Sequence, residues 1–273
     1  MTTPYPNNPI IWPALPHDHT GDNQLGYYTQ ETTQRFTSGT RGITWDGKVF
    51  KYGRSKATLV PGMGSINSAQ NDVSDLPNSS TTIAIVAGDR STTLTLASTE
   101  GYDSSGGLAE NELVGAQFVI GHGATGTGET RTIMSNTYLA DGGGTSIITV
   151  DAPWVLAHAA GFSETVLNPY HYMGLASTSN GYGSVMGMPN VAATTGQFYW
   201  MQTWGPCWVT PGGGDSTPGD SANDRTVYFV GDGSVNGGAA LTLESGSQQA
   251  GFIIDGTETG TGCMPLVMLQ LSI

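Results

Sequence analysis

The chain has 273 residues, of which 22 are Asp or Glu and nine are Lys or Arg, so its formal net charge is −13. This acidic balance excludes nucleic acid as the main partner, because contacts to phosphates require Lys and Arg. No apolar run approaches the roughly 18 residues of a membrane-spanning helix. The N-terminal sequence lacks the basic and apolar regions of a signal peptide, so we expect no membrane span and no export signal.

The composition also predicts the fold class. Only 11% of the residues are charged, whereas 40 of the 273 residues are Gly. A sequence that is rich in Gly and poor in Lys disfavours helices and favours short strands joined by tight turns. We therefore expect an all-β protein built from antiparallel β-sandwich or barrel units.

Residues 1–30 are expected to form an extended N-terminal arm. Proline locks the backbone φ and removes a hydrogen-bond donor, and five prolines punctuate this segment. The arm also carries apolar and aromatic side chains that would become buried if it lay across another subunit. A disordered terminus is the alternative. The prolines are Pro4, Pro6, Pro9, Pro13 and Pro16, and the side chains available for burial include Ile10, Ile11, Trp12, Leu15, Tyr27 and Tyr28.

The segment Gly42–Arg54 carries the strongest short-range signal in the chain. Asp46-Gly47 separates two apolar runs, and Gly takes the positive φ of a hairpin turn without steric cost. We therefore predict a β-hairpin. It lies in the only basic region of the chain, and a positive patch on an acidic protein predicts a docking surface. Six of the nine Lys and Arg residues lie here: Arg35, Arg41, Lys48, Lys51, Arg54 and Lys56.

Period-two hydrophobic runs between turn signals dominate residues 81–164, which we interpret as an inserted β domain. The flanking segments 31–80 and 165–273 would then form one discontinuous β base domain. The polar end of the first segment, residues 65–80, is a plausible linker. Within the insertion, Trp154–Ala160 predicts one short helix.

The segment Gln197–Val209 is a dense aromatic strand pair with a Gly-Pro break, and the chain closes on the apolar strand Leu266–Leu271. Alternation places aromatic side chains on both faces of the strand, so at least one face belongs to the core or to a subunit interface. A sugar-stacking platform is the alternative, although it would expose a large apolar patch. The residues assigned to the core or an oligomer interface are Phe198, Trp200, Trp204 and Trp208.

No motif in the chain predicts catalysis, a cofactor or a metal. Gly121–Gly126 fits G-x-G-x-x-G, but a strand-like sequence follows it where pyrophosphate binding requires a helix. His17-Asp18-His19 offers too few ligands for a closed metal site. Cys207 and Cys263 are expected to be two reduced, packed thiols. We therefore predict a protein that is not an enzyme and holds no cofactor or metal.

The hairpin sequence Gly42–Tyr52, followed by Ala57–Gly62, resembles small β-rich virion proteins of tailed bacteriophages, the head decoration and cement proteins. Three further passages are similar to the same group: Gly126–Ile133, Phe198–Pro206 and Pro265–Leu271. The resemblance implies a non-enzymatic structural protein of the virion. Such a protein binds the outer capsid surface, often as a homotrimer, and stabilises the capsid by holding neighbouring capsomers together.

On this interpretation the partners are the major capsid protein and other copies of the chain, and assembly takes place in the host cytoplasm. The arm and the basic hairpin would face the capsid, through Trp12 and the six basic residues of the hairpin region. Residues 81–155 would project outward. The alternative is a carbohydrate- or receptor-binding β-module of a phage tail or surface structure that uses the tryptophans. A hydrolase with scattered carboxylates is the third class.

Overall fold

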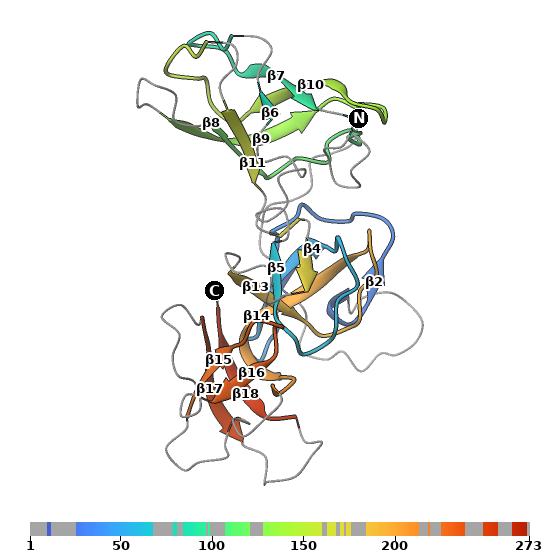
Figure 1. Ribbon diagram of the computed structural model, residues 1–273, viewed down its shortest axis with the longest axis vertical. Coiled ribbons are helices and arrows are strands. Elements are labelled where there is room, and N and C mark those ends of the chain that lie inside the picture. Colours follow the sequence, from blue (N-terminus) through green and yellow to red (C-terminus); the bar gives the residue numbers. More distant parts are fainter. Residues whose placement is uncertain are drawn as a thin grey trace. The chain divides into compact units, whose positions relative to one another are not determined.

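The computed structural model describes residues 10–11, 26–67, 79–80, 84–96, 98, 107–120, 128–159, 163–167, 170–171, 173–175, 184–212, 218, 225–237, 248–255 and 264–271. Strands dominate this part of the chain, the only helical element in it is a 3₁₀ turn, η1 (Gly26–Tyr28), and no helix in it is long and apolar enough to span a membrane (Figure 1). The predicted all-β, antiparallel fold class is confirmed.

The chain divides into two compact units. Unit 1 comprises Met1–Ser68 and Met173–Ile273, and unit 2 comprises Ala69–Tyr172. The sequence-based limits of the insertion were 81 and 164, so unit 2 begins earlier and ends later than those limits. Of the predicted arm the structure describes only residues 10–11 and 26–30, and the remainder, including Trp12, lies outside the described residues.

Unit 1 contains one branched sheet of twelve strands. Its main order is β1-β3-β4-β14-β18-β17-β15-β16, with β2, β5, β12 and β13 attached beside it. The pairs between these strands are antiparallel except that β1 runs parallel to β3. The strands are β1 (Ile10–Ile11), β2 (Gln30–Glu31), β3 (Arg41–Ile43), β4 (Val49–Arg54), β5 (Ser65–Asn67), β12 (Met173–Leu175), β13 (Val185–Pro189), β14 (Phe198–Trp208), β15 (Thr226–Phe229), β16 (Val235–Gly237), β17 (Gln249–Asp255) and β18 (Leu266–Gln270).

The eleven-residue strand β14 organises unit 1, because it pairs with β4 along one edge and with β2, β13 and β18 along the other. Alternate side chains Tyr199 and Met201 are fully buried, and Phe198 and Trp200 are buried as well, so protein covers both faces of its first half. The aromatic core on one face consists of Phe50, Tyr52, Phe198 and Trp200, with Tyr27 and Phe36 packed against them.

A second, aliphatic core lies where β14 pairs with β18. It extends across β17, β15 and β16 and also includes residues of β5 and β13. Valine predominates, which suits the inner face of a curled sheet. The buried members are Ile66, Val185, Met188, Cys207, Val209, Val227, Phe229, Val235, Ala250, Val267 and Leu269.

Unit 2 is a six-stranded sheet in the order β6-β11-β8-β9-β10-β7. All of its pairs are antiparallel, and its inward side chains form one core that also holds Trp154. The strands are β6 (Ser79–Ser80), β7 (Ser91–Leu96), β8 (Gln117–Ile120), β9 (Glu129–Asn136), β10 (Gly144–Val150) and β11 (Ser163–Leu167). The core comprises Ile85, Leu94, Leu96, Leu108, Leu113, Ala116, Phe118, Ile120, Ile133, Ile148, Val150 and Trp154.

The helix predicted near Trp154–Ala160 is wrong for the described residues 154–159, which form bends and one β-bridge. In a helix, the N–H of His158 would donate to the carbonyl of Trp154. Here His158 N–H donates to Ile85 instead, and the carbonyl of Trp154 accepts from Gly88. Pairing with a distant segment therefore overrides a weak local preference.

A buried carboxylate holds the same loop in place. Glu129 accepts the N–H groups of Val155 at 3.0 Å and Leu156 at 2.6 Å, and lies 2.6 Å from Arg131 and 3.3 Å from His158. Burial by itself raises the pKa of this carboxyl. The two backbone hydrogen bonds, aided by His158 and Arg131, outweigh that effect and lower the pKa below its ordinary value.

Candidate functional site

The predicted hairpin is present as β3 and β4, which pair through Ile43 opposite Val49 and Arg41 opposite Lys51. The turn closes by a hydrogen bond from Gly47 N–H to the carbonyl of Thr44 at 3.0 Å, with φ of Gly47 at +84°. The Thr44 hydroxyl bonds the carboxylate of Asp46 as well. The turn chemistry therefore follows the sequence pattern, and the hairpin is a rigid element.

Arg41 and Lys51 form the most unusual part of this hairpin, because like charges directly opposite on neighbouring strands repel each other. Burial lowers the pKa of Lys51 first, and the charge of Arg41 lowers it further. The Nε of Arg41 is buried without a hydrogen-bond partner in the part of the chain that the structure describes. A buried guanidinium nitrogen without a hydrogen-bond acceptor lowers the stability of the fold.

The other basic residues do not join this pair in one open patch. Arg35 binds Glu31 at 3.1 Å, and Lys48 binds Asp46 at 3.5 Å. The guanidinium of Arg54 lies 5.3 Å from the ring centre of Phe198, so Arg54 packs on the aromatic core. Lys56 is half-buried beside β12, where its N–H donates to Met173. Of the predicted patch, the structure thus brings together Arg41 and Lys51.

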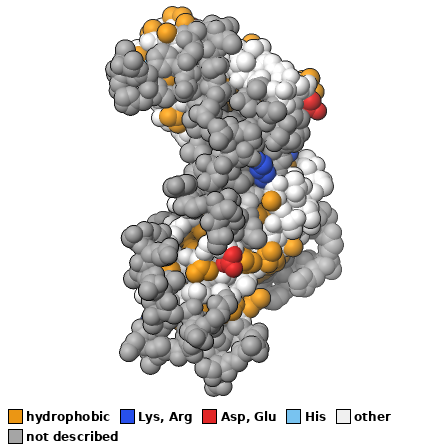
Figure 2. Space-filling model, viewed as in Figure 1, with side chains coloured by type: hydrophobic (Ala, Val, Ile, Leu, Met, Phe, Trp, Pro, Cys, Tyr) orange, Lys and Arg blue, Asp and Glu red, His pale blue; other side chains and the backbone are white. Residues whose placement is uncertain are grey.

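The aromatic strand divides into a buried half and an exposed half. Phe198 and Trp200 lie in the core, Trp204 is half-buried, and Trp208 is 58% exposed. Trp45, at the tip of the hairpin, is 68% exposed, and the sequence pattern assigned it no role. Figure 2 shows hydrophobic side chains gathered in a band on the visible face of unit 1, with acidic atoms among them.

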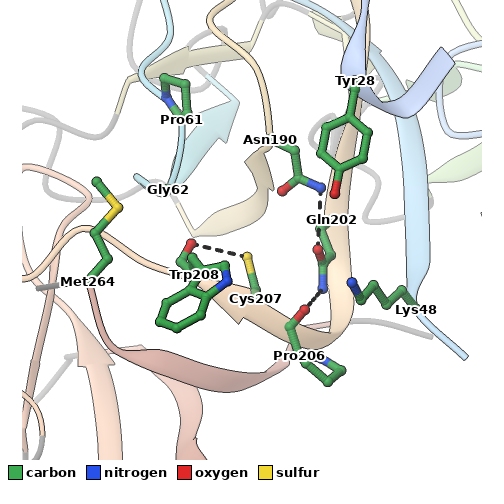
Figure 3. Close-up of a pocket in the computed structure, with 10 residues that line it drawn as sticks. All are labelled: Tyr28, Lys48, Pro61, Gly62, Asn190, Gln202, Pro206, Cys207, Trp208 and Met264. Carbon is green, nitrogen blue, oxygen red and sulfur yellow. Dashed lines mark hydrogen bonds between the residues drawn. The ribbon is translucent and has the colours of Figure 1, made fainter. Parts of the chain in front are cut away.

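A cavity of about 190 Å³ lies between the start of β4 and the middle of β14. In Figure 3 the side chains of Tyr28, Lys48 and Gln202 point toward the same space. The cavity is smaller than the roughly 300–1,000 Å³ of typical ligand pockets. Its lining consists of Tyr28, Lys48, Pro61, Gly62, Asn190, Gln202, Pro206, Cys207, Trp208 and Met264.

The floor of this cavity is held by Gln202, whose side-chain amide donates to the carbonyls of Trp204, Gly205 and Pro206 at 2.9–3.2 Å. Its oxygen accepts from Asn190 at 3.4 Å. These bonds hold β14 where its pairing with β4 shifts register. Because the amide of Gln202 is fully engaged, a ligand in the cavity would meet the Tyr28 hydroxyl, the exposed aromatic faces and the Lys48 ammonium, which is paired with Asp46.

Cys207 adds no nucleophile to this cavity. Burial raises the pKa of its thiol to about 12, and its Sγ donates to the carbonyl of Trp208 at 3.4 Å. A thiol with so high a pKa is protonated and unreactive near neutral pH. Cys263 lies outside the described residues.

Within the described ranges, no three His, Cys, Asp or Glu side chains converge as metal ligands. His17, Asp18, His19 and the Gly121–Gly126 motif lie outside these ranges. His158 and His171 are both buried in unit 2, beside Glu129 and Glu112, respectively.

Comparison with known proteins gives no match to a family model, to a curated protein or to a solved structure.

Proposed function

We propose that this chain is a non-enzymatic structural protein of a phage virion, which attaches to the outer capsid surface as a homotrimer and holds neighbouring capsomers together. The resemblance of the hairpin and the aromatic strand to head decoration and cement proteins supports the class of function. The cation pair Arg41 and Lys51 supports the mode of attachment.

The pair fits an acidic protein partner because of its charge. Two cations side by side on a protein of net charge −13 attract an external carboxylate. A carboxylate placed against the two charged side chains would relieve the repulsion between them. Hydrogen bonds to ionised groups are roughly twice as strong as neutral ones.

The edge of the sheet places the N-terminal segment beside the same pair. Ile10 and Ile11 form β1, which runs parallel to β3 opposite Gly42 and Ile43, directly next to Arg41. The proposed capsid-facing side therefore consists of β1, β3 and the exposed hairpin tip at Trp45.

The test is co-sedimentation of the purified chain with capsids that lack it, using Lys51→Glu. This change turns the repulsive pair into an attractive one, so the fold is expected to keep or gain stability. Attachment should weaken at least about tenfold, which corresponds to ~1.4 kcal/mol. Arg90→Glu is the matched control, since it makes the same charge change at an exposed position of unit 2. Wild-type occupancy by Lys51→Glu would overturn the proposal.

A second candidate function, a carbohydrate-binding module, is favoured by the cavity at β14. Trp208 and Tyr28 are both more than half exposed at its lining, near the Lys48 ammonium and the Asn190 amide. Exposed aromatic rings beside polar groups suit the apolar face and hydroxyls of a sugar. A glycan panel decides: binding that Trp208→Ala abolishes without loss of folding supports this candidate, and no binding to any glycan excludes it.

A further inference from the structure

The sheet formed by β14, β18, β17 and β15 has two apolar faces, although only one of them lies against the aliphatic core of unit 1. Inward residues such as Val227, Val267 and Leu269 are fully buried in that core. On an antiparallel sheet with one solvated face, the outward positions are usually polar. The outward positions here depart from that pattern.

The register of the pairs defines one outward row across all four strands. Thr226 lies opposite Phe252, Phe252 opposite Met268, and Met268 opposite Pro206. Residues directly opposite on neighbouring strands have their side chains in contact distance on the same face. Three of the four positions in this row are apolar, and the row is continuous across the sheet.

A second row lies beside the first. Asp255 lies opposite Leu266, and Leu266 opposite Trp208, with Ile254 at a bulge next to Asp255. Phe252 is 44% exposed and Ile254 is 47% exposed, and Leu266 is half-buried between its neighbours. The two rows together form a contiguous outward patch, which we call the outer face. Such exposed apolar patches mark interaction sites in soluble proteins.

The outer face is also poor in charge. Asp255 is the only ionisable residue in the two rows, in a chain that carries 22 acidic residues. Two copies of an acidic protein repel each other over most of their surfaces, and the repulsion is least where charge is absent. A foreign acidic or basic partner would find little electrostatic complementarity here. The charge pattern therefore favours a second copy of the same chain over the partner that the cationic hairpin suits.

We propose that the outer face, centred on Phe252, Met268 and Leu266, is the surface through which copies of this chain associate. The inference deepens the proposed function, on which it rests in taking the partner to be another copy. In a homotrimer each outer face would pack against the neighbouring copy, and apolar sheet faces that pack together lie about 10 Å apart. Trp208, which β14 carries at the rim of this face, is then covered in the assembly.

The exposed area is sufficient for such contact. Aromatic side chains bury 150–250 Å² each, and two of them, Trp208 and Phe252, are about half exposed here. With the aliphatic residues beside them, the outer face offers on the order of 400 Å² of apolar area per copy. Two copies would thus remove roughly 800 Å² of apolar area. Stable interfaces begin at about 1,200 Å² of total buried area, so the polar residues around the outer face would have to supply about a third of it.

The experiment is sedimentation equilibrium of the full chain over a wide range of concentration, without capsids. Wild type is expected to self-associate, and Phe252→Glu is expected to sediment with the mass of one chain, 28.4 kDa. Thr226→Glu changes a smaller side chain in the same row and should weaken association at least about tenfold. Far-ultraviolet circular dichroism and a thermal melt establish that both variants are folded. Ile147→Glu is the matched control, an exposed apolar strand residue of unit 2, and it should associate like wild type.

A monomeric wild type, or a folded Phe252→Glu and Thr226→Glu that associate normally, would overturn the inference. Dissociation of the Ile147→Glu control would overturn it too, because a surface of unit 2 would then hold the copies together. Failure of the two proposals can be told apart. If Lys51→Glu still decorates capsids while Phe252→Glu is monomeric, the attachment proposal fails and the outer face stands. If Lys51→Glu no longer decorates capsids while Phe252→Glu associates like wild type, only the proposal for the outer face fails.

Discussion

Gly251 in β17 is the position where the smallest change should have the largest effect on unit 1. Its φ is +154°, and a Cβ added there would lie 1.9 Å from the carbonyl oxygen of Met268 and 2.9 Å from the carbonyl carbon. Non-bonded carbon and oxygen atoms approach to about 3.3 Å. In Gly251→Ala, β17 and β18 must therefore separate by more than 1 Å, because a backbone atom cannot rotate away as a side chain can.

The magnitude follows from two costs. An L-residue held at such a φ costs about 1–3 kcal/mol. Separating the strands weakens the pairing of Gly251 with Leu269 and Val227, at about 1 kcal/mol for each hydrogen bond affected. We expect Gly251→Ala to lower the free energy of unfolding of unit 1 by about 3–5 kcal/mol, at the upper end of single substitutions.

Urea unfolding followed by tryptophan fluorescence, in a Trp154→Phe background, is the assay, since the tryptophans other than Trp154 belong to unit 1. The two units need not unfold together, and a signal from unit 1 avoids treating the chain as two-state. The control is Gly196→Ala, because Gly196 also has a positive φ, +85°, but a Cβ there meets nothing within 4 Å. Gly196→Ala should lower the free energy of unfolding only by the backbone cost of about 1–2 kcal/mol. If Gly251→Ala and Gly196→Ala lose the same amount, the steric argument is wrong.

Three further predictions concern unit 2 and the buried thiol. Because the folded pKa of Glu129 is lowered, its stabilisation is complete above the unfolded pKa of about 4.3 and is lost as the pH falls through the folded value. The melting temperature of wild type should therefore fall more steeply than that of Glu129→Gln between about pH 5 and about pH 3, and parallel curves would contradict this. Phe118→Ala empties a fully buried site and should cost about 3–5 kcal/mol, whereas Tyr138→Ala at an exposed site should cost at most about 0.5 kcal/mol by urea titration. With Cys263→Ser in the background, a thiol reagent should label Cys207 only as urea unfolds unit 1, since burial raises its pKa to about 12; rapid labelling in buffer would refute this.

The hairpin shows how far local sequence reasoning extends. The Asp46-Gly47 turn and the pairing of the runs around it depend on neighbours within a few residues, so the sequence predicted them correctly. The burial of Phe198 and Trp200 can also be predicted from the sequence, because aromatic residues at alternating positions of a strand pack against apolar surroundings.

Whether each basic side chain is already paired could not be predicted from the sequence in the same way. Arg54 packs against Phe198, which lies more than 140 positions away in the sequence, and Arg35 and Lys48 pair with nearby acids. Whether a basic residue is open or already engaged depends on which segments the sheet places beside it. No periodicity in the sequence indicates which segments become neighbours in the sheet. The predicted patch of six basic residues is therefore reduced to one close pair, Arg41 and Lys51.

The failed helix at Trp154 has the same origin. The local composition favours a helix weakly, but the backbone groups of the loop bond to Ile85, Gly88 and Glu129. Hydrogen bonds to these distant partners replace the helical hydrogen bonds without reducing their number. The weak local preference for a helix therefore does not determine the structure of this loop.

The sequence by itself determined the all-β class, the hairpin and the aromatic strand, because turn chemistry and alternation act over a few residues. The tertiary structure alone decided that β14 joins β4 to β18, that Arg41 and Lys51 stand together, and that an apolar outer face remains on one sheet. These features arise from pairing between segments far apart in the chain, and the strand register that creates them is set by the packing of the whole core.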